Sequence, residues 1–243
     1  MRKQFVRVDD GLMMAKHETT NADYRNFLDA LLADGQTDLY KRCLPDTQSW
    51  LILGVQATPL VSHYFRNPAY DNYPVTGLSR TAVDTYLKWL TESYQVQSRT
   101  RYPKASFMLP TRDEWIRAAQ GGDTSRVYTW GSGFIRNSRG EDLCNYRHVE
   151  LKLDSVTGRF VEVPEPSGDI FKFTTRTDTY FPNTYGLFNM CGNVAEMIAE
   201  PGTVVGGSFN DPAWKVRIKS EQGFGHPSPM VGFRVIVRLD EKG

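Results

Sequence analysis

The stretch NMCGNVAEM, residues 189–197, places two amides and one carboxylate among apolar residues. Asn189 and Glu196 offer side-chain oxygens, and a Gly–Asn turn at residues 192–193 can direct backbone carbonyls inward, which are the ligands that calcium prefers. A β-turn whose asparagine side chains bond their own backbone explains the same letters more simply. From spacing alone both interpretations stay open, and the turn is the simpler one.

Patterns of the common catalytic sites are absent from the sequence. The chain contains no GxSxG, HExxH, GxxxxGK[ST] or GxGxxG motif. Its acidic residues are scattered, so a mechanism with paired carboxylates has no support. The histidines are far apart in sequence, which favours surface or structural roles for all of them: His17, His63, His148 and His226.

Composition predicts one folded domain over residues 1–243 with a substantial core. The chain has 29 basic and 28 acidic residues, a net charge of +1, so no nucleic-acid or anionic-membrane partner is expected. The sequence contains no apolar run long enough for a transmembrane segment. The basic start, MRKQFVRVDDG, lacks the apolar region of a signal peptide. We expect a soluble chain, from which a signal or lipid-anchor segment of a longer precursor could have been removed.

The predicted secondary structure differs between the first and the second half of the chain. Apolar residues at helical spacing predict helices over 20–35, after Ser79 and over 111–122. Thr20 with Asp23, and Thr111 with Glu114, have the spacing of capping boxes. After residue 122 short apolar runs alternate with glycine, proline, asparagine and aspartate, which predicts short strands and long loops.

Eight blocks of the sequence resemble, in order, the formylglycine-generating enzyme family, also called the sulfatase-modifying-factor domain. The resemblance covers residues 12–237 and includes KHETTNADYRNFL, YPVTGLSRTAVDTYLKWL, LPTRDEWIRAAQGG, YTWG, CNY, PNTYGLFNMCGNVAEM, VVGGSFNDPAW and GFRVIV. It implies an elaborated C-type-lectin-like α+β fold, low in regular secondary structure, whose long loops are held by calcium ions.

The resemblance also implies two structural calcium sites. One would use the side chains of Asn189 and Glu196 with the backbone carbonyls of Gly192 and Val194. The other would use Asn145, the carbonyl of Tyr146, Asp169 and the carbonyl of Phe171.

Oxidase members of this family bind copper through two cysteines, five residues apart, just after the GGS[WF] block. In GGSFNDPAWKV those positions are Asp211 and Val216. Copper(I) is selected by soft thiolates, so the oxidase chemistry loses its ligands here. Three other cysteines lie in other blocks and have no CxxC spacing: Cys43, Cys144 and Cys191. We interpret Cys191 as a core residue and predict a pseudoenzyme with no catalytic residues.

Three segments are similar to lipoproteins of the gliding-motility and type IX secretion machinery, a non-catalytic branch of the family. They are LYKRCLPDTQSWL, YFRNPAYDNYPV and GGSFNDPAW. This resemblance implies a structural component that binds protein partners in the bacterial cell envelope, in the periplasm or at the outer membrane. Without a removed signal segment, the chain would be cytoplasmic.

Two other functions stay open from the sequence. The first is a lectin-like module whose ligand site is lined by Trp214, Phe224 and His226, with Phe209 belonging to the core. The second is an enzyme, either a formylglycine-generating-type oxidase despite the missing cysteine pair or one that uses a different metal or cofactor. Arg234 and Glu114 are expected to hold the last strand and the third helix in place by buried charged hydrogen bonds, without a catalytic role.

Overall fold

The computed structural model describes residues 4–97, 105–164 and 172–239. The helices are α1 (Asn21–Ala33), α2 (Thr37–Cys43), η1 (Thr47–Leu53), η2 (Val55–Ala57), α3 (Thr58–His63), η3 (Pro68–Tyr70), α4 (Arg80–Gln97) and α5 (Arg112–Gln120), where η marks a 3-10 helix. The strands are β1 (Phe5–Asp9), β2 (Leu12–Ala15), β3 (Ala105–Met108), β4 (Val149–Leu153), β5 (Phe160–Pro164), β6 (Ala195–Met197), β7 (Thr203–Val205), β8 (Glu221–Gly223), β9 (Val231–Phe233) and β10 (Ile236–Leu239). Helices segregated from mainly antiparallel strands make this an α+β fold.

The three predicted helices are α1, α4 and α5, and both predicted capping boxes are formed. In α1 the Thr20 side chain accepts from the backbone of Asp23, while the Asp23 side chain accepts from the backbone of Thr20. Thr111 and Glu114 repeat this arrangement at the start of α5. The pattern did not predict the short helices between residues 37 and 70, because elements of three to seven residues are too short for helical periodicity to be visible.

Two four-stranded sheets carry the core. The first has the order β1-β2-β10-β3 and is antiparallel throughout. The second has the order β8-β7-β6-β9, and its β6–β9 pair is parallel. Only Arg234 and Val235 separate β9 from β10, so the last part of the chain runs directly from one sheet into the other.

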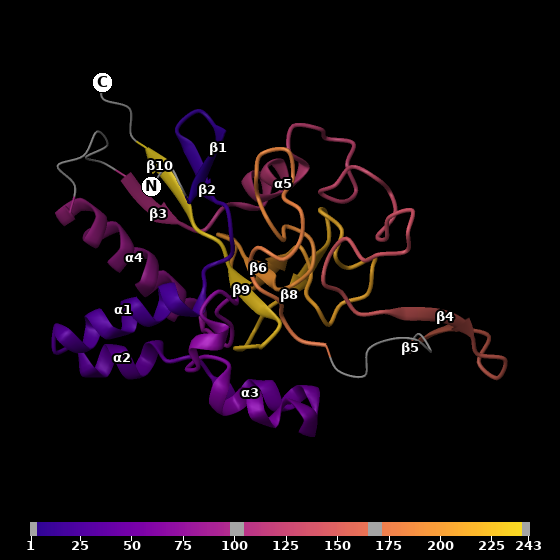
Figure 1. The fold of residues 1–243 in the computed structure, drawn as a ribbon, viewed down its shortest axis with the longest axis horizontal. Helices are drawn as coiled ribbons and strands as arrows, with labels where there is room; N and C mark the ends of the chain where they lie inside the picture. Colours follow the sequence, from indigo (N-terminus) through magenta and orange to yellow (C-terminus); the bar gives the residue numbers. More distant parts are fainter. Residues whose placement is uncertain (1–3, 98–104, 165–171, 240–243) are drawn as a thin grey trace.

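Figure 1 places α1, α2 and α4 together at one end of the molecule and the β4–β5 hairpin at the other. A first core cluster packs α1 and α4 against the sheets, with Phe27, Tyr86 and Phe233 fully or almost fully buried. A second cluster surrounds Trp115 of α5 and includes Met190. Long loops between α5 and β6 complete the centre, so the loop of residues 189–194 is enclosed by packed elements.

None of the helices in the described parts of the chain has the length and apolar character that crossing a membrane requires.

Candidate functional site

The 189–194 loop takes a backbone conformation that its glycine and asparagines allow. Asn189, Gly192 and Asn193 have φ angles of 51°, 77° and 65°, in the left-handed region where asparagine and glycine are tolerated best. A Cβ atom on Gly192 would lie 2.3 Å from the carbonyl oxygen of Asn145. The backbone N–H of Asn193 donates to that same oxygen at 2.9 Å. A glycine is therefore required where this loop crosses the chain at Asn145.

Glu196 and Arg234 form a buried ion pair at the end of this loop. Arg234 Nη2 lies 2.7 Å from Glu196 Oε1, and the side chains are 0% and 1% exposed. Trp115 Nε1 donates to Glu196 Oε2 at 2.6 Å. Arg234 also donates to the carbonyls of Ala15, Lys16 and Phe188. The expected structural role of Arg234 is confirmed, with Glu196 as its partner. Glu114 of α5 pairs with Arg238 of the last strand, β10, in a contact that is only partly buried.

A second carboxyl group, Glu18, lies in the same buried region. Its Oε1 accepts from Asn193 Nδ2 at 2.7 Å, and its Oε2 is 4.0 Å from Arg234 Nη2. Burial raises the pKa of Glu18 to about 8, although the Arg234 charge opposes this shift. Two buried carboxyl groups therefore share one guanidinium, and ionising both would leave an excess negative charge.

The oxygen atoms around Asn189 are of the kinds that bind a hard cation such as calcium. Its Nδ2 is 3.4 Å from Glu18 Oε2 and 3.3 Å from the carbonyl of Arg176, while its Oδ1 is buried without a hydrogen-bond partner. An unpaired buried oxygen is unusual, and calcium accepts amide, carboxylate and carbonyl oxygens. Glu196 is the weaker candidate, since Arg234 and Trp115 already engage both of its oxygens. Gly192 and Val194 lie in the buried part of the loop, and the first calcium site stays a prediction.

The second predicted calcium site lies partly outside the described residues, because Asp169 and Phe171 belong to the segment 165–171. Asn145 and Tyr146 are buried. The carbonyl of Tyr146 accepts from Lys172 Nζ at 3.3 Å, so an ammonium group lies where the prediction places a cation. Among the described residues, no cluster of three or more His, Cys, Asp or Glu side chains could hold a metal ion.

Asp211 and Val216, which the family resemblance predicts to be the counterparts of the oxidase cysteines, have structural contacts of their own. Asp211 Oδ2 accepts from the backbone N–H of Ser208 at 2.9 Å and from its hydroxyl at 2.7 Å. Val216 is fully buried in the second core cluster. An aspartate in a turn and a valine in the core do not supply the soft ligands that copper(I) needs, so a copper centre does not fit these positions.

The three cysteines are buried and unpaired. Burial raises the pKa of all three thiols, that of Cys191 to about 12 and that of Cys144 well above its ordinary value. Reactive cysteines need the opposite shift, toward the thiolate. The interpretation of Cys191 as a core residue is confirmed by its place in the second cluster.

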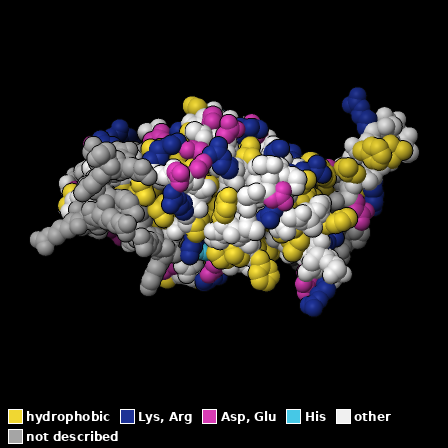
Figure 2. Space-filling model, turned by 90° about the horizontal axis from the view of Figure 1, so that it is seen from above, with side chains coloured by type: hydrophobic (Ala, Val, Ile, Leu, Met, Phe, Trp, Pro, Cys, Tyr) yellow, Lys and Arg dark blue, Asp and Glu magenta, His cyan; other side chains and the backbone are white. Residues whose placement is uncertain are grey.

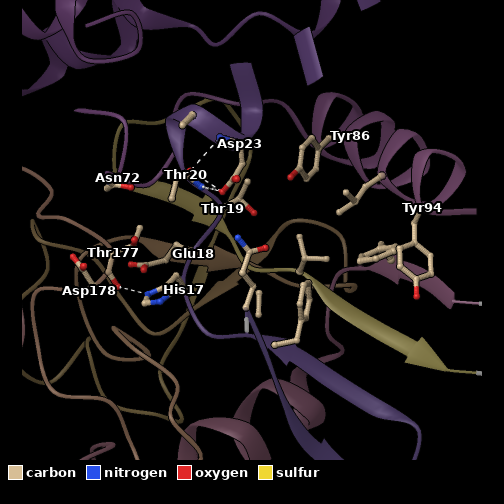
Figure 3. A pocket seen from close by; sticks show the side chains of 17 residues that line it. His17, Glu18, Thr19, Thr20, Asp23, Asn72, Tyr86, Tyr94, Thr177 and Asp178 are labelled. Carbon is tan, nitrogen blue, oxygen red and sulfur yellow. Dashed lines mark hydrogen bonds between the residues drawn. The ribbon is translucent and has the colours of Figure 1, made fainter. Parts of the chain in front are cut away.

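A cavity of about 460 Å³ opens beside Glu18, between the 16–20 segment and α4. Figure 3 shows His17, Asn72 and Thr177 on one side of it and Tyr86 and Tyr94 on the other. His17 Nδ1 donates to the carbonyl of Thr177 at 3.0 Å, and its ring stacks on Phe188. Burial lowers the pKa of His17, which favours the neutral ring.

The three residues predicted to line a ligand site come from two loops, one with Trp214 and one with Phe224 and His226. Trp214 is in the loop after Asp211, where its carbonyl accepts from the Ser220 hydroxyl. Phe224 packs against the first core cluster, and His226 is exposed. Phe209, expected in the core, is buried against Trp50. The cavity beside Glu18 has none of these residues in its lining.

Sequence reasoning missed Glu18 as part of the buried network. It lies two residues before the N-cap of α1, where an acidic residue is ordinarily solvated. Its burial depends on Asn193 and Arg234, which are 175 and 216 positions away, so local spacing carried no signal.

Two solved structures have the same fold as this chain. Treponema denticola variable protein 1 superposes with a TM-score of 0.55 and 16% identity, covering 97% of this chain and 91% of that one. CarF superposes with a TM-score of 0.56, also at 16% identity, covering 94% and 87%. At this identity the likeness defines the fold alone.

The model of the FGE-sulfatase family, described as the sulfatase-modifying factor enzyme 1-like domain, matches residues 2–239. The chain therefore belongs to this family. It is 25% identical over 214 residues to the formylglycine-generating enzyme of Mus musculus, covering 80% of this chain and 50% of the relative. The Streptomyces coelicolor formylglycine-generating enzyme is 30% identical over 129 residues, or 53% of this chain and 32% of the relative. The chain thus spans at most half the length of these relatives.

Proposed function

We propose that this chain is a non-catalytic member of its family, stabilised by calcium, that binds protein partners in a bacterial envelope assembly such as the gliding-motility or type IX secretion machinery. The observation that supports the proposal is that Asp211 and Val216 stand, by the family resemblance, at the two positions where the oxidases have their copper-binding cysteines. Both positions have structural contacts in this chain, and neither can act as a thiolate ligand.

A copper(I) titration tests the non-catalytic part directly. Purified protein would compete with a chromophoric copper(I) chelator, beside the Asp211→Cys/Val216→Cys double variant. We expect the native chain to leave the chelator loaded, because its own thiols are buried with raised pKa values. One tightly bound copper per native chain would contradict the proposal. Copper binding by the double variant would verify that the backbone of residues 208–216 can hold two thiolates.

The calcium part of the proposal is supported by the unpaired Asn189 Oδ1 and by the excess of buried acceptor groups near Glu18. Calcium would supply a fixed positive charge there and hold the 189–194 loop in place. Its role would be structural, through oxygens contributed by separate segments.

The protein-binding part is supported by an exposed apolar segment in LYKRCLPDTQSWL and the residues that follow. Trp50 is buried against Tyr64, which fixes η1 on the body of the molecule. Its neighbour Ile52 is 73% exposed, and Leu51 and Val55 are also exposed. Contiguous exposed apolar residues on a fixed element are typical of contact surfaces.

A matched affinity purification tests the protein-binding part. The native chain and an Ile52→Asp variant would be used as baits on a detergent-solubilised envelope fraction, with Val96→Asp on α4, where Val96 is 89% exposed, as the control. We expect one envelope protein to be retained at near-equal amounts by the native chain and the control, and to be lost with Ile52→Asp. Retention of the same proteins by all three baits would contradict the proposed surface.

A small-ligand module is the second candidate, and the cavity beside Glu18 favours it. The cavity has hydrogen-bonding groups on one side and aromatic rings on the other, which is the usual composition of a ligand site. Native mass spectrometry of the freshly purified chain discriminates the two functions. A bound small molecule that is lost in an Asn72→Ala variant, which changes an exposed lining residue, would favour the ligand module.

A further inference from the structure

The β4–β5 hairpin is a two-stranded sheet that projects from the body of the molecule (Figure 1). Its antiparallel register runs from Val149 opposite Pro164 to Leu153 opposite Phe160. Within the described parts of the chain, no third strand pairs with either of them. An isolated hairpin is only marginally stable in water, and an unpaired strand edge readily accepts another strand.

One face of the hairpin carries exposed apolar side chains. Directly opposite residues of an antiparallel pair lie on the same face, so Leu151, Leu153 and Phe160 share one face of this sheet with Glu162, which pairs with Arg147. The three apolar side chains are 53%, 60% and 70% exposed. Figure 2 shows hydrophobic side chains on the projection at the end of the molecule where Figure 1 places the hairpin. Among the described parts of the chain, nothing covers most of the surface of these three apolar side chains.

The backbone of β4 points its free hydrogen-bonding groups outward at every second residue. Asp154 N donates to the carbonyl of Arg159 at 2.8 Å, so Asp154 is in a hydrogen-bonded pair with the residue opposite it. Hydrogen-bonded and non-hydrogen-bonded pairs alternate along an antiparallel ladder. The N–H and C=O groups of Leu153, Leu151 and Val149 therefore face the outer edge of β4, away from β5.

The charges of β4 are complementary to a second copy of the same strand. The strand reads VELKL, with Glu150 and Lys152 placed symmetrically around Leu151. Antiparallel pairing of two copies centred on Leu151 puts Glu150 opposite Lys152 of the partner subunit, and the reverse. These positions form non-hydrogen-bonded pairs, in which side chains approach most closely and opposite charges stabilise. A register centred on Glu150 or on Lys152 would instead place like charges opposite each other.

From these relationships we infer that the chain forms a two-fold symmetric homodimer through the outer edge of β4. The two hairpins make one four-stranded antiparallel sheet, in the order β5-β4-β4-β5. Leu151 lies against its own symmetry mate, and the apolar faces of both hairpins become continuous. The two-fold axis makes the contact self-complementary, as in most homodimers. Because one strand pair buries a small area, the dimer dissociates on dilution.

Sedimentation equilibrium of charge variants tests the pairing. We expect Glu150→Lys and Lys152→Glu to be monomeric when each is alone, since both place like charges across the axis. An equimolar mixture of the two recovers the dimer, because each strand then faces its opposite charge. The double variant Glu150→Lys/Lys152→Glu dimerises like the native chain. The control is Val156→Asp in the hairpin turn, outside the pairing, which leaves dimerisation unchanged. A native dimer that persists in both single variants would overturn the inference.

Cysteine cross-linking captures the pair even when the dimer is weak. At a hydrogen-bonded position such as Leu151, the two Cα atoms would lie about 5.5 Å apart, within the range that a disulfide spans. We expect Leu151→Cys to form a covalent dimer under mild oxidation much faster than Val156→Cys. The native cysteines do not compete, because all three are buried. Equal rates for the two variants, or no covalent dimer of Leu151→Cys, would overturn the inference.

Discussion

Arg234 and Glu196 form a fully buried ion pair that ties the 189–197 segment to the turn between the two four-stranded sheets. Arg234 Nη2 is 2.7 Å from Glu196 Oε1, and Nε lies 3.1 Å from the same oxygen. The remaining guanidinium contacts reach carbonyls before α1 and at Phe188. A single side chain thus holds three segments that are distant in sequence.

Removing one partner of this pair should strongly destabilise the fold. We expect Arg234→Met to lower the free energy of unfolding by about 3–5 kcal/mol, because Glu196 would keep a buried charge without its partner. Urea denaturation followed by circular dichroism measures the change. Arg238→Met is the control, because the Arg238 side chain is 48% exposed in its pair with Glu114 and the pair is expected to contribute at most about 1 kcal/mol. Equal losses in the two variants would contradict the importance of burial.

The crossing of the 189–194 loop over Asn145 predicts a specific intolerance at Gly192. Gly192→Ala should cost well over 2 kcal/mol, since the left-handed conformation costs about 1–2 kcal/mol and the new Cβ also meets the Asn145 carbonyl. Gly140→Ala measures the cost of the left-handed backbone conformation alone, because the φ of Gly140 is 80° and an added Cβ there has open space around it. Thermal melts of Gly192→Ala and Gly140→Ala give the comparison. Similar melting temperatures would mean that the crossing does not constrain the loop.

Calcium binding at Asn189 predicts a chelator effect that depends on this residue. A site filled at 100 times its dissociation constant adds about 2.7 kcal/mol to stability. We therefore expect EDTA to lower the melting temperature of the native chain and to have little effect on Asn189→Ala. Comparing the chelator shift, instead of the melting temperature itself, separates calcium loss from general damage. Asn210→Ala is the control, because Asn210 contacts Arg147 and Ser208 through its backbone O and N atoms. An unchanged native melt would exclude a structural calcium at Asn189.

His17 predicts a loss of stability in mild acid. Burial holds its pKa below the ordinary value of about 6.5. The unfolded chain then takes up a proton more readily than the folded chain. The contribution of His17 to stability is therefore fully present above the unfolded pKa and is lost as the pH falls through the lower pKa of the folded state. A His17→Gln variant cannot titrate. We expect the stability difference between the native chain and this variant to change between pH 7.5 and pH 5, as measured by urea denaturation. A constant difference would contradict a buried neutral imidazole.

The sequence predicted the parts of the fold that depend on local order. Capping residues and helical spacing indicated α1, α4 and α5, and the turn-rich composition after residue 122 indicated short strands with long loops. The family followed from ordered blocks of sequence, and the family model matches residues 2–239.

The candidate site was less predictable, because its partners come from distant segments. Glu196 was interpreted as a calcium ligand, and its contacts with Arg234 and Trp115 depend on the packing of α5 and the sheets. Glu18 carried no local signal at all. The ammonium of Lys172 at the Tyr146 carbonyl likewise arises from tertiary folding.

Conversion of a peptide cysteine is the measurement that tests the central claim most directly. The native chain would be incubated with copper, oxygen and a peptide containing the cysteine of a sulfatase, beside the Streptomyces coelicolor formylglycine-generating enzyme as a positive control. Mass spectrometry of the peptide distinguishes cysteine from formylglycine. Because Asp211 and Val216 replace the copper ligands, we expect the relative to convert the peptide and this chain to leave it unchanged. Catalytic conversion by the native chain would contradict the non-catalytic function.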